Sequence, residues 1–129
     1  MAKATGRPVA VTVATKVITN DVSSVTFSTP YGTAEVTGLD KSAVERLLLL
    51  ADCTITLSGE GINTATDMSF SVLKNPASAA TKVVVLGITG GTLTATCVQT
   101  DYQVTIGKDG NFTWTAPFSL ANGTAAAWT

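Results

Sequence analysis

Apolar and polar side chains alternate with a period of two along most of this chain, which is typical of β-strands with one buried face. Residues 9–13 read VAVTV and residues 102–106 read YQVTI. Turn-forming residues separate the alternating runs, and residues 107–110 (GKDG) join two of them as a hairpin. The alternation predicts strands at residues 9–18, 24–28, 33–37, 53–57, 68–72, 82–88, 92–100, 102–106 and 112–114.

One stretch breaks this period and instead predicts an α-helix over residues 40–51. Asp40 is a good N-cap, because its carboxylate can accept hydrogen bonds from the exposed amides of the first turn. Leu39 and Val44 have the spacing of a hydrophobic staple. Leu49 lies off the apolar stripe, so it either marks the edge of that stripe or contacts a second protein surface. The stripe itself has helical spacing and consists of Ala43, Val44, Leu47, Leu48 and Ala51.

These elements predict a mainly β fold, a β-sandwich or barrel of about eight strands with one helix near residues 40–51. We expect the helix to place its leucines on the core and to close one open end of the sandwich. The 129 residues fit a single domain, with residues 1–8 as an N-terminal arm and residues 122–129 as a C-terminal tail. Cys53 and Cys97 fall at apolar strand positions, which predicts two free, buried thiols. A disulfide between them would require the two strands to be neighbours.

Charge is scarce in this chain. Charged residues make up 13% of it, about half the usual share. Threonine occurs 23 times, and the net charge is −1. This composition fits strands whose outer faces touch other protein, and it fits equally a monomeric β domain with a neutral, threonine-rich face. The absence of a net positive charge argues against a protein that binds nucleic acid through its phosphates.

The residue types needed for catalysis are missing or scattered. Without histidine, the chain lacks the commonest general base, and the two cysteines have no such partner to activate them. The nine acidic residues are spread over turns and caps. We therefore predict no enzyme, no catalytic residue, no metal and no cofactor. The polar start and the short apolar runs predict neither a signal peptide nor a membrane partner.

Residues 36–52 (VTGLDKSAVERLLLLAD) resemble a segment of the major tail tube proteins of long-tailed, siphovirus-like bacteriophages. In that family a phrase of the kind V-T-G-x-D-x-S-A-x-E-R introduces the single helix, and a strand like residues 53–59 (CTITLSG) follows. Residues 100–114 are similar to the last hairpin of the family. The ending L-x-x-G-T-x-x-x-W, which runs here from Leu120 to Trp128, is similar to its C-terminus.

The resemblance implies a structural virion protein. Subunits of this family form hexameric rings that stack into a hollow tail tube, and double-stranded genomic DNA passes through the tube without specific binding. The tape measure protein, the tail terminator and the tail-tip proteins are the further partners implied. The subunit would be made in the host bacterial cytoplasm. Contacts between subunits are expected at Lys3, Arg7, Tyr31, Leu49, Glu60, Ile62 and Trp128.

Two other functions fit parts of the sequence. A capsid decoration protein, or another β-sandwich of the virion surface, is the alternative, because such proteins are also rich in strands and poor in charge. A carbohydrate-binding module would need coplanar, exposed aromatic rings, and aromatic residues make up 6% of the chain. The slight negative charge favours the DNA conduit, because a basic channel would hold the phosphates that it has to pass.

Overall fold

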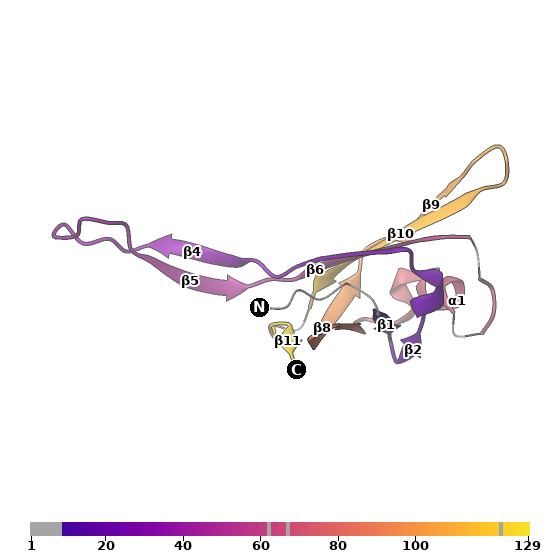
Figure 1. Ribbon diagram of the computed structural model, residues 1–129, viewed down its shortest axis with the longest axis horizontal. Coiled ribbons are helices and arrows are strands. Elements are labelled where there is room, and N and C mark those ends of the chain that lie inside the picture. Colours follow the sequence, from indigo (N-terminus) through magenta and orange to yellow (C-terminus); the bar gives the residue numbers. More distant parts are fainter. Residues whose placement is uncertain (1–8, 62, 67, 122) are drawn as a thin grey trace.

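The computed structural model describes residues 9–61, 63–66, 68–121 and 123–129. Within these residues, nine strands form an antiparallel sheet in the order β2-β1-β7-β8-β10-β6-β3, with β9 paired to β10 and β11 paired to β8 (Figure 1). The strands are β1 (Ala10–Val13), β2 (Lys16–Val17), β3 (Ser24–Ser28), β6 (Thr54–Glu60), β7 (Lys82–Ile88), β8 (Gly91–Gln99), β9 (Gln103–Ile106), β10 (Phe112–Leu120) and β11 (Ala127–Trp128). The mainly β fold predicted from the period of two is confirmed.

The core lies on the concave face of this sheet. Burial alternates strictly along the central strands, so that Leu93, Ala95 and Cys97 of β8 are buried while Thr94 and Thr96 are partly exposed. The largest side chains inside are Trp114 and Phe118 of β10. Cys53 and Cys97 are both buried, as the sequence predicts. Burial, together with the nearby Cys53, raises the pKa of Cys97 to about 11.

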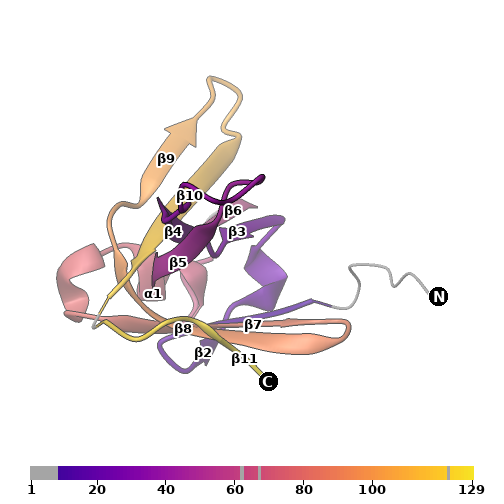
Figure 2. The ribbon, with the colours of Figure 1, turned by 90° about the vertical axis from the view of Figure 1, so that its left-hand side faces the viewer.

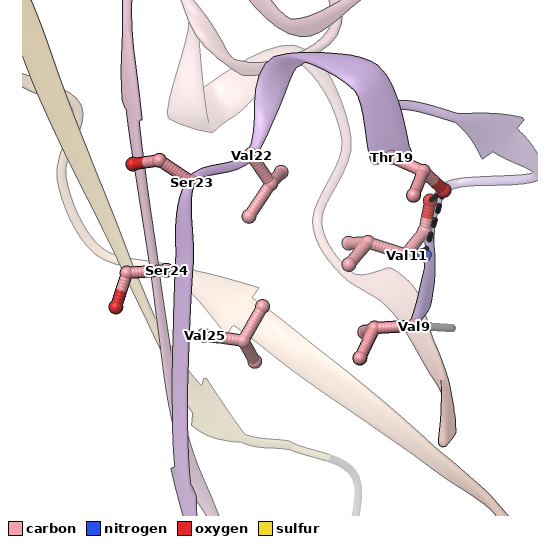
Figure 3. A pocket seen from close by; sticks show the side chains of 7 residues that line it. All are labelled: Val9, Val11, Thr19, Val22, Ser23, Ser24 and Val25. Atoms are coloured by element: carbon pink, nitrogen blue, oxygen red, sulfur yellow. Dashed lines mark hydrogen bonds between the residues drawn. The ribbon is translucent and has the colours of Figure 1, made fainter. Parts of the chain in front are cut away.

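The two ends of the sheet come to face one another. Val11 on β1 and Val25 on β3 project from opposite sides into a cleft of about 220 Å³ (Figure 3). Thr19 lies at the rim, where its hydroxyl accepts a hydrogen bond of 2.9 Å from the Val11 amide. The curled sheet is therefore an open barrel, closed by side chains between β1 and β3.

A second sheet of two strands, β4 (Tyr31–Glu35) and β5 (Arg46–Ala51), extends the first. β3 leads into β4, and β5 leads into β6, so residues 24–35 and 46–60 form one long antiparallel ribbon. At the junction the Asp52 amide donates a hydrogen bond of 2.8 Å to the Pro30 carbonyl oxygen. The inner half of the ribbon belongs to the main sheet. The outer half, called here the β4–β5 hairpin (residues 31–51), projects far from the body of the molecule in Figure 1 and points toward the viewer in Figure 2.

The helix predicted over residues 40–51 is wrong. Residues 46–51 form β5 instead, and Leu47 and Leu48 lie opposite Ala34 and Thr33 of β4. Asp40 is not an N-cap: it lies in the turn at the tip of the hairpin. An isolated helix of twelve residues is marginal unless its apolar stripe packs on a core. The β3–β6 ladder continues directly into this segment and satisfies its backbone by pairing, and the four leucines stay at least half exposed.

The helix of the described chain, α1 (Ser69–Leu73), lies where the alternation of residues 68–72 predicts a strand. Its first amide, on Ser69, donates a hydrogen bond of 2.9 Å to a carboxylate oxygen of Asp21. Asn63 donates another, of 3.1 Å, to the second oxygen of Asp21. Burial alone would raise the pKa of Asp21, but these hydrogen bonds outweigh it and hold the pKa below its ordinary value. Asp21 itself is the last residue of the short 3-10 turn η1 (Thr19–Asp21).

Two buried polar side chains hold the other end of α1. Lys82 donates to the side-chain oxygen of Gln99 and, over 3.1 Å, to the Val72 carbonyl oxygen. The Gln99 amide donates over 2.7 Å to the Leu73 carbonyl oxygen. These carbonyl groups lie at the C-terminal end of the helix. Lys82 and Gln99, which belong to the sheet, therefore cap that end of α1. Burial lowers the pKa of Lys82. The turn η2 (Pro76–Ser78) then leads back to β7.

Candidate assembly interface

The β4–β5 hairpin exposes an unusual amount of apolar surface. Four consecutive leucines on β5 are all exposed: Leu47 by 57%, Leu48 by 69%, Leu49 by 53% and Leu50 by 89%. Soluble monomers rarely leave a contiguous apolar patch of this kind in water, and larger patches mark surfaces that bind protein or membrane. The described residues contain no helix long and apolar enough to cross a membrane. Because of its exposed leucines, the hairpin is the strongest candidate for an interface.

The polar groups of the hairpin are concentrated toward its tip. Lys41 and Glu45 form an exposed ion pair of 3.6 Å, and the Glu45 amide donates a hydrogen bond of 2.9 Å to the Thr37 hydroxyl. Glu35 and Arg46 lie opposite each other on the two strands. Leu39, in the turn itself, is fully exposed. The hairpin therefore has a charged outer part and an uncharged leucine run nearer the body.

A hollow lies at the base of the hairpin, where the hairpin meets the segment that follows β10. Its volume is about 300 Å³. Its walls are apolar and carry no charge; they are formed by Leu49, Leu50, Ala51, Leu120, Gly123 and Ala125. The exposed leucine run thus continues into an apolar recess of the body.

A second uncharged surface is the outer face of β7 and β8. The side chains that point away from the core include Val83 on β7, and Thr94, Thr96 and Val98 on β8. Val83 and Val98 are each 39% exposed. The threonine-rich composition noted in the sequence is therefore realised as a neutral outer sheet face.

Of the contact residues predicted from the sequence, the fold brings Tyr31 and Leu49 together on the hairpin. Tyr31 starts β4 and is 51% exposed, and Leu49 lies on the paired strand. Glu60 ends β6 far from the hairpin, opposite Thr113 of β10. Trp128 is 49% exposed and lies edge-on to the Phe27 ring at 5.8 Å, so it packs at least partly on its own body. Lys3, Arg7 and Ile62 lie outside the described residues.

Sequence reasoning missed most of the exposed leucines because it assigned Leu47 and Leu48 to the core and did not weigh Leu50 at all. One signal could have found them. An amphipathic helix interrupts its apolar positions with polar ones, whereas residues 47–50 form an unbroken apolar run. Such a run is typical of a strand that is covered on both faces.

The cleft between β1 and β3 is lined by no acidic, basic or cysteine side chain. Its lining residues are valines, serines and one threonine, and none of them ionises near neutral pH: Val9, Val11, Thr19, Val22, Ser23, Ser24 and Val25. Among the described residues, no group of three or more histidine, cysteine, aspartate or glutamate side chains is placed to hold a metal. The apolar hairpin, rather than a pocket, is the feature that calls for a partner.

No protein-family model matches this chain, and no curated protein sequence matches it. Solved structures do. A chain from the virion of a native gene transfer agent (GTA) particle aligns with a TM-score of 0.73 and 14% identity, over 98% of this chain and 99% of its own length. A chain from the tail of an empty GTA particle, refined with C6 symmetry, aligns with a TM-score of 0.64 and 16% identity, over 84% of this chain and 82% of its own. The protein therefore shares its fold with chains of GTA virion and tail particles.

Proposed function

We propose that this protein is a structural subunit of a phage-like tail and that its function is to assemble with copies of itself. The observation that carries the proposal is the run of exposed leucines at residues 47–50 on a projecting hairpin. Complete burial of one leucine side chain is favourable by about 1.5–3 kcal/mol. The leucine run therefore favours a state in which another molecule covers it. The fold shared with a chain of the GTA tail supports the same assignment.

In this proposal six copies form a ring, and the rings stack into a hollow tube in the virion. The C6 symmetry of the GTA tail supports the number six. The hairpin gives the subunit reach, because it projects from the body (Figure 1) and the four residue steps of β4, from Tyr31 to Glu35, alone span about 13 Å. A contact of this kind, made by different surfaces of two copies, repeats without closing and so suits a stack.

The charge of the chain fits the passage of double-stranded DNA through such a tube. With a net charge of −1 per subunit, a ring of six carries −6. A wall of this sign does not gain affinity for phosphates through counterion release, so DNA can move along it. The tape measure protein, the tail terminator and the tail-tip proteins would be the other partners. No enzymatic step is needed for this role.

Negative-stain electron microscopy of the purified protein tests the proposal. We expect six-fold rings or hollow tubes, with light scattering that reports masses far above 13.2 kDa. Monomers under all conditions, including the presence of tail partners, would contradict it. Trimers or monomers that decorate a capsid would instead indicate the alternative, a capsid decoration protein.

A further inference from the structure

The two cysteines lie in one row across the main sheet, with Leu120 of β10 between them. Leu120 is the register partner of Cys97 on β8. On its other side, the register of β10 with β6 ends at Ser119 and Thr54. The next residues along these antiparallel chains are Leu120 and Cys53, and the Leu120 amide donates a hydrogen bond of 2.9 Å to the Cys53 carbonyl oxygen. Residues opposite each other in a sheet point to the same face, so both thiols project from the core face, where both are fully buried.

The position of β10 keeps the two sulfur atoms from joining. Neighbouring strands lie about 4.8 Å apart, so two strand spacings separate the Cα atoms of Cys53 and Cys97 by roughly 10 Å. A disulfide needs about 4.4–6.8 Å between these atoms. Backbone hydrogen bonds hold β10 on both sides, because the Ala121 amide donates over 2.9 Å to the Thr96 carbonyl oxygen while the Leu120 amide bonds to Cys53. A cross-link would therefore require this end of β10 to leave the sheet.

We infer that this protein has to fold before its cysteines are oxidised, because a Cys53–Cys97 disulfide and the native position of β10 exclude each other. In the unfolded chain no strand separates the two thiols, and the entropic cost of closing the loop between them grows only slowly with its length. Glutathione disulfide is an oxidant of the required class. It is reduced to two glutathione thiols, which take up two electrons and two protons, while a sulfur–sulfur bond forms between Cys53 and Cys97.

The oxidised chain could not complete its sheet. With the two cysteines joined, Leu120 has no place between them, and its hydrogen bond to Cys53 is lost. Phe118, two residues earlier on β10, is one of the largest side chains of the core, so displacement of this end of β10 would also disturb the core. Reduction of the disulfide would be the way back to the native fold.

The folded chain, in contrast, protects its thiols. Burial raises the pKa of Cys97 to about 11, and burial together with the Asp52 carboxylate raises the pKa of Cys53. Both shifts lower the amount of thiolate, which is the form that attacks a disulfide. An oxidant can reach the buried sulfur atoms only when the sheet opens. The inference concerns a single chain, so it stands independently of the assembly proposed above.

Oxidation before and after folding tests the inference. The full chain is incubated with glutathione disulfide, once in native buffer and once in concentrated urea, and mass spectrometry of its peptides measures the Cys53–Cys97 linkage. We expect the native chain to form this linkage at least about 100-fold more slowly than the unfolded chain. After removal of urea, the oxidised chain should lack the near-ultraviolet circular dichroism of the native core. Dithiothreitol should restore it.

The matched control combines Cys53→Ala with Cys97→Ala. This variant has no thiol, so oxidant in urea should not change its refolding. The reversal by dithiothreitol is measured on the unaltered chain, and the test therefore does not depend on the stability of the variant.

Three results would overturn the inference. The first is a native chain that forms the Cys53–Cys97 disulfide as fast as the unfolded chain. The second is an oxidised chain that regains the native circular dichroism while the disulfide persists. The third is an unfolded chain that forms no linkage between the two cysteines.

Discussion

Leu48→Asp places one charge in the middle of the leucine run on the β4–β5 hairpin. In the monomer this side chain is 69% exposed, and its strand partner is Thr33. The new carboxylate would therefore remain in water, and the free energy of unfolding should change by no more than about 0.5 kcal/mol. In the proposed assembly a neighbouring copy covers the same position, so we expect the substitution to act on association alone.

The size of the effect follows from the exposed fraction. Complete burial of a leucine stabilises by about 1.5–3 kcal/mol, so covering the 69% that Leu48 exposes is worth about 1–2 kcal/mol. Aspartate loses this contribution, and an unpaired buried carboxylate costs several kcal/mol more. A total of at least about 3 kcal/mol corresponds to association weakened more than 100-fold.

Sedimentation velocity across a concentration series measures the association, and thermal unfolding measures the monomer. The control is Ile106→Asp, which introduces the same charge at a site of nearly equal exposure, 67%, on β9. Leu48→Asp should leave monomers at concentrations where Ile106→Asp and the unaltered protein assemble. If Leu48→Asp assembles normally, or if it lowers the melting temperature by many degrees, the reasoning is refuted.

Three further predictions concern the body of the molecule. Gly59→Ala should destabilise by about 3 kcal/mol or more in denaturant unfolding, because the new Cβ would lie 2.1 Å from the Asp21 carbonyl oxygen and 2.6 Å from the Trp114 ring. Gly87→Ala, whose Cβ meets atoms at 3.5 Å, should be nearly neutral. Because the folded state lowers the pKa of Asp21, its carboxylate stabilises the fold above the ordinary value of 3.8, and this contribution is lost as the pH falls below it. Asp21→Asn should therefore be less stable at pH 7, with a difference from the unaltered protein that shrinks below pH 3.8; a constant difference would be contrary to this account. With a pKa of about 11, Cys97 should resist a thiol reagent at pH 8 until the protein unfolds, and rapid labelling of the native protein would contradict its burial.

The period of two predicted the strands of the main sheet well. Residues 82–88 and 92–100 form β7 and β8 almost as predicted, and residues 107–110 form the turn between β9 and β10. These segments have one face on the core and one outside, so the side-chain pattern carries the information directly. The same pattern misled at residues 68–72. There, Asp21 and Lys82 hold the two ends of a short helix from distant parts of the chain.

Some of the contact residues predicted from the sequence lie on the hairpin and others do not. Tyr31 and Leu49 lie on the hairpin that we propose as the interface, and they remain predictions until the assembly is measured. Glu60 and Trp128 lie on other strands, where Glu60 is opposite Thr113 of β10 and Trp128 pairs with Leu93 of β8. The apolar hairpin was not predicted because a helix was expected to bury its leucines.

By itself, the sequence determined a mainly β chain that is poor in charge, has no histidine and buries its two cysteines. Alternation and composition are local properties, so they can be read without knowing which segments meet. Only the tertiary structure decided whether residues 40–51 form a helix or a part of the hairpin. Their apolar spacing is compatible with a helix on the core or with a strand, and the choice depends on what lies beside them. Because β3 and β6 are already paired at the base of the hairpin, where this segment ends, the ladder continues outward and carries four leucines into solvent.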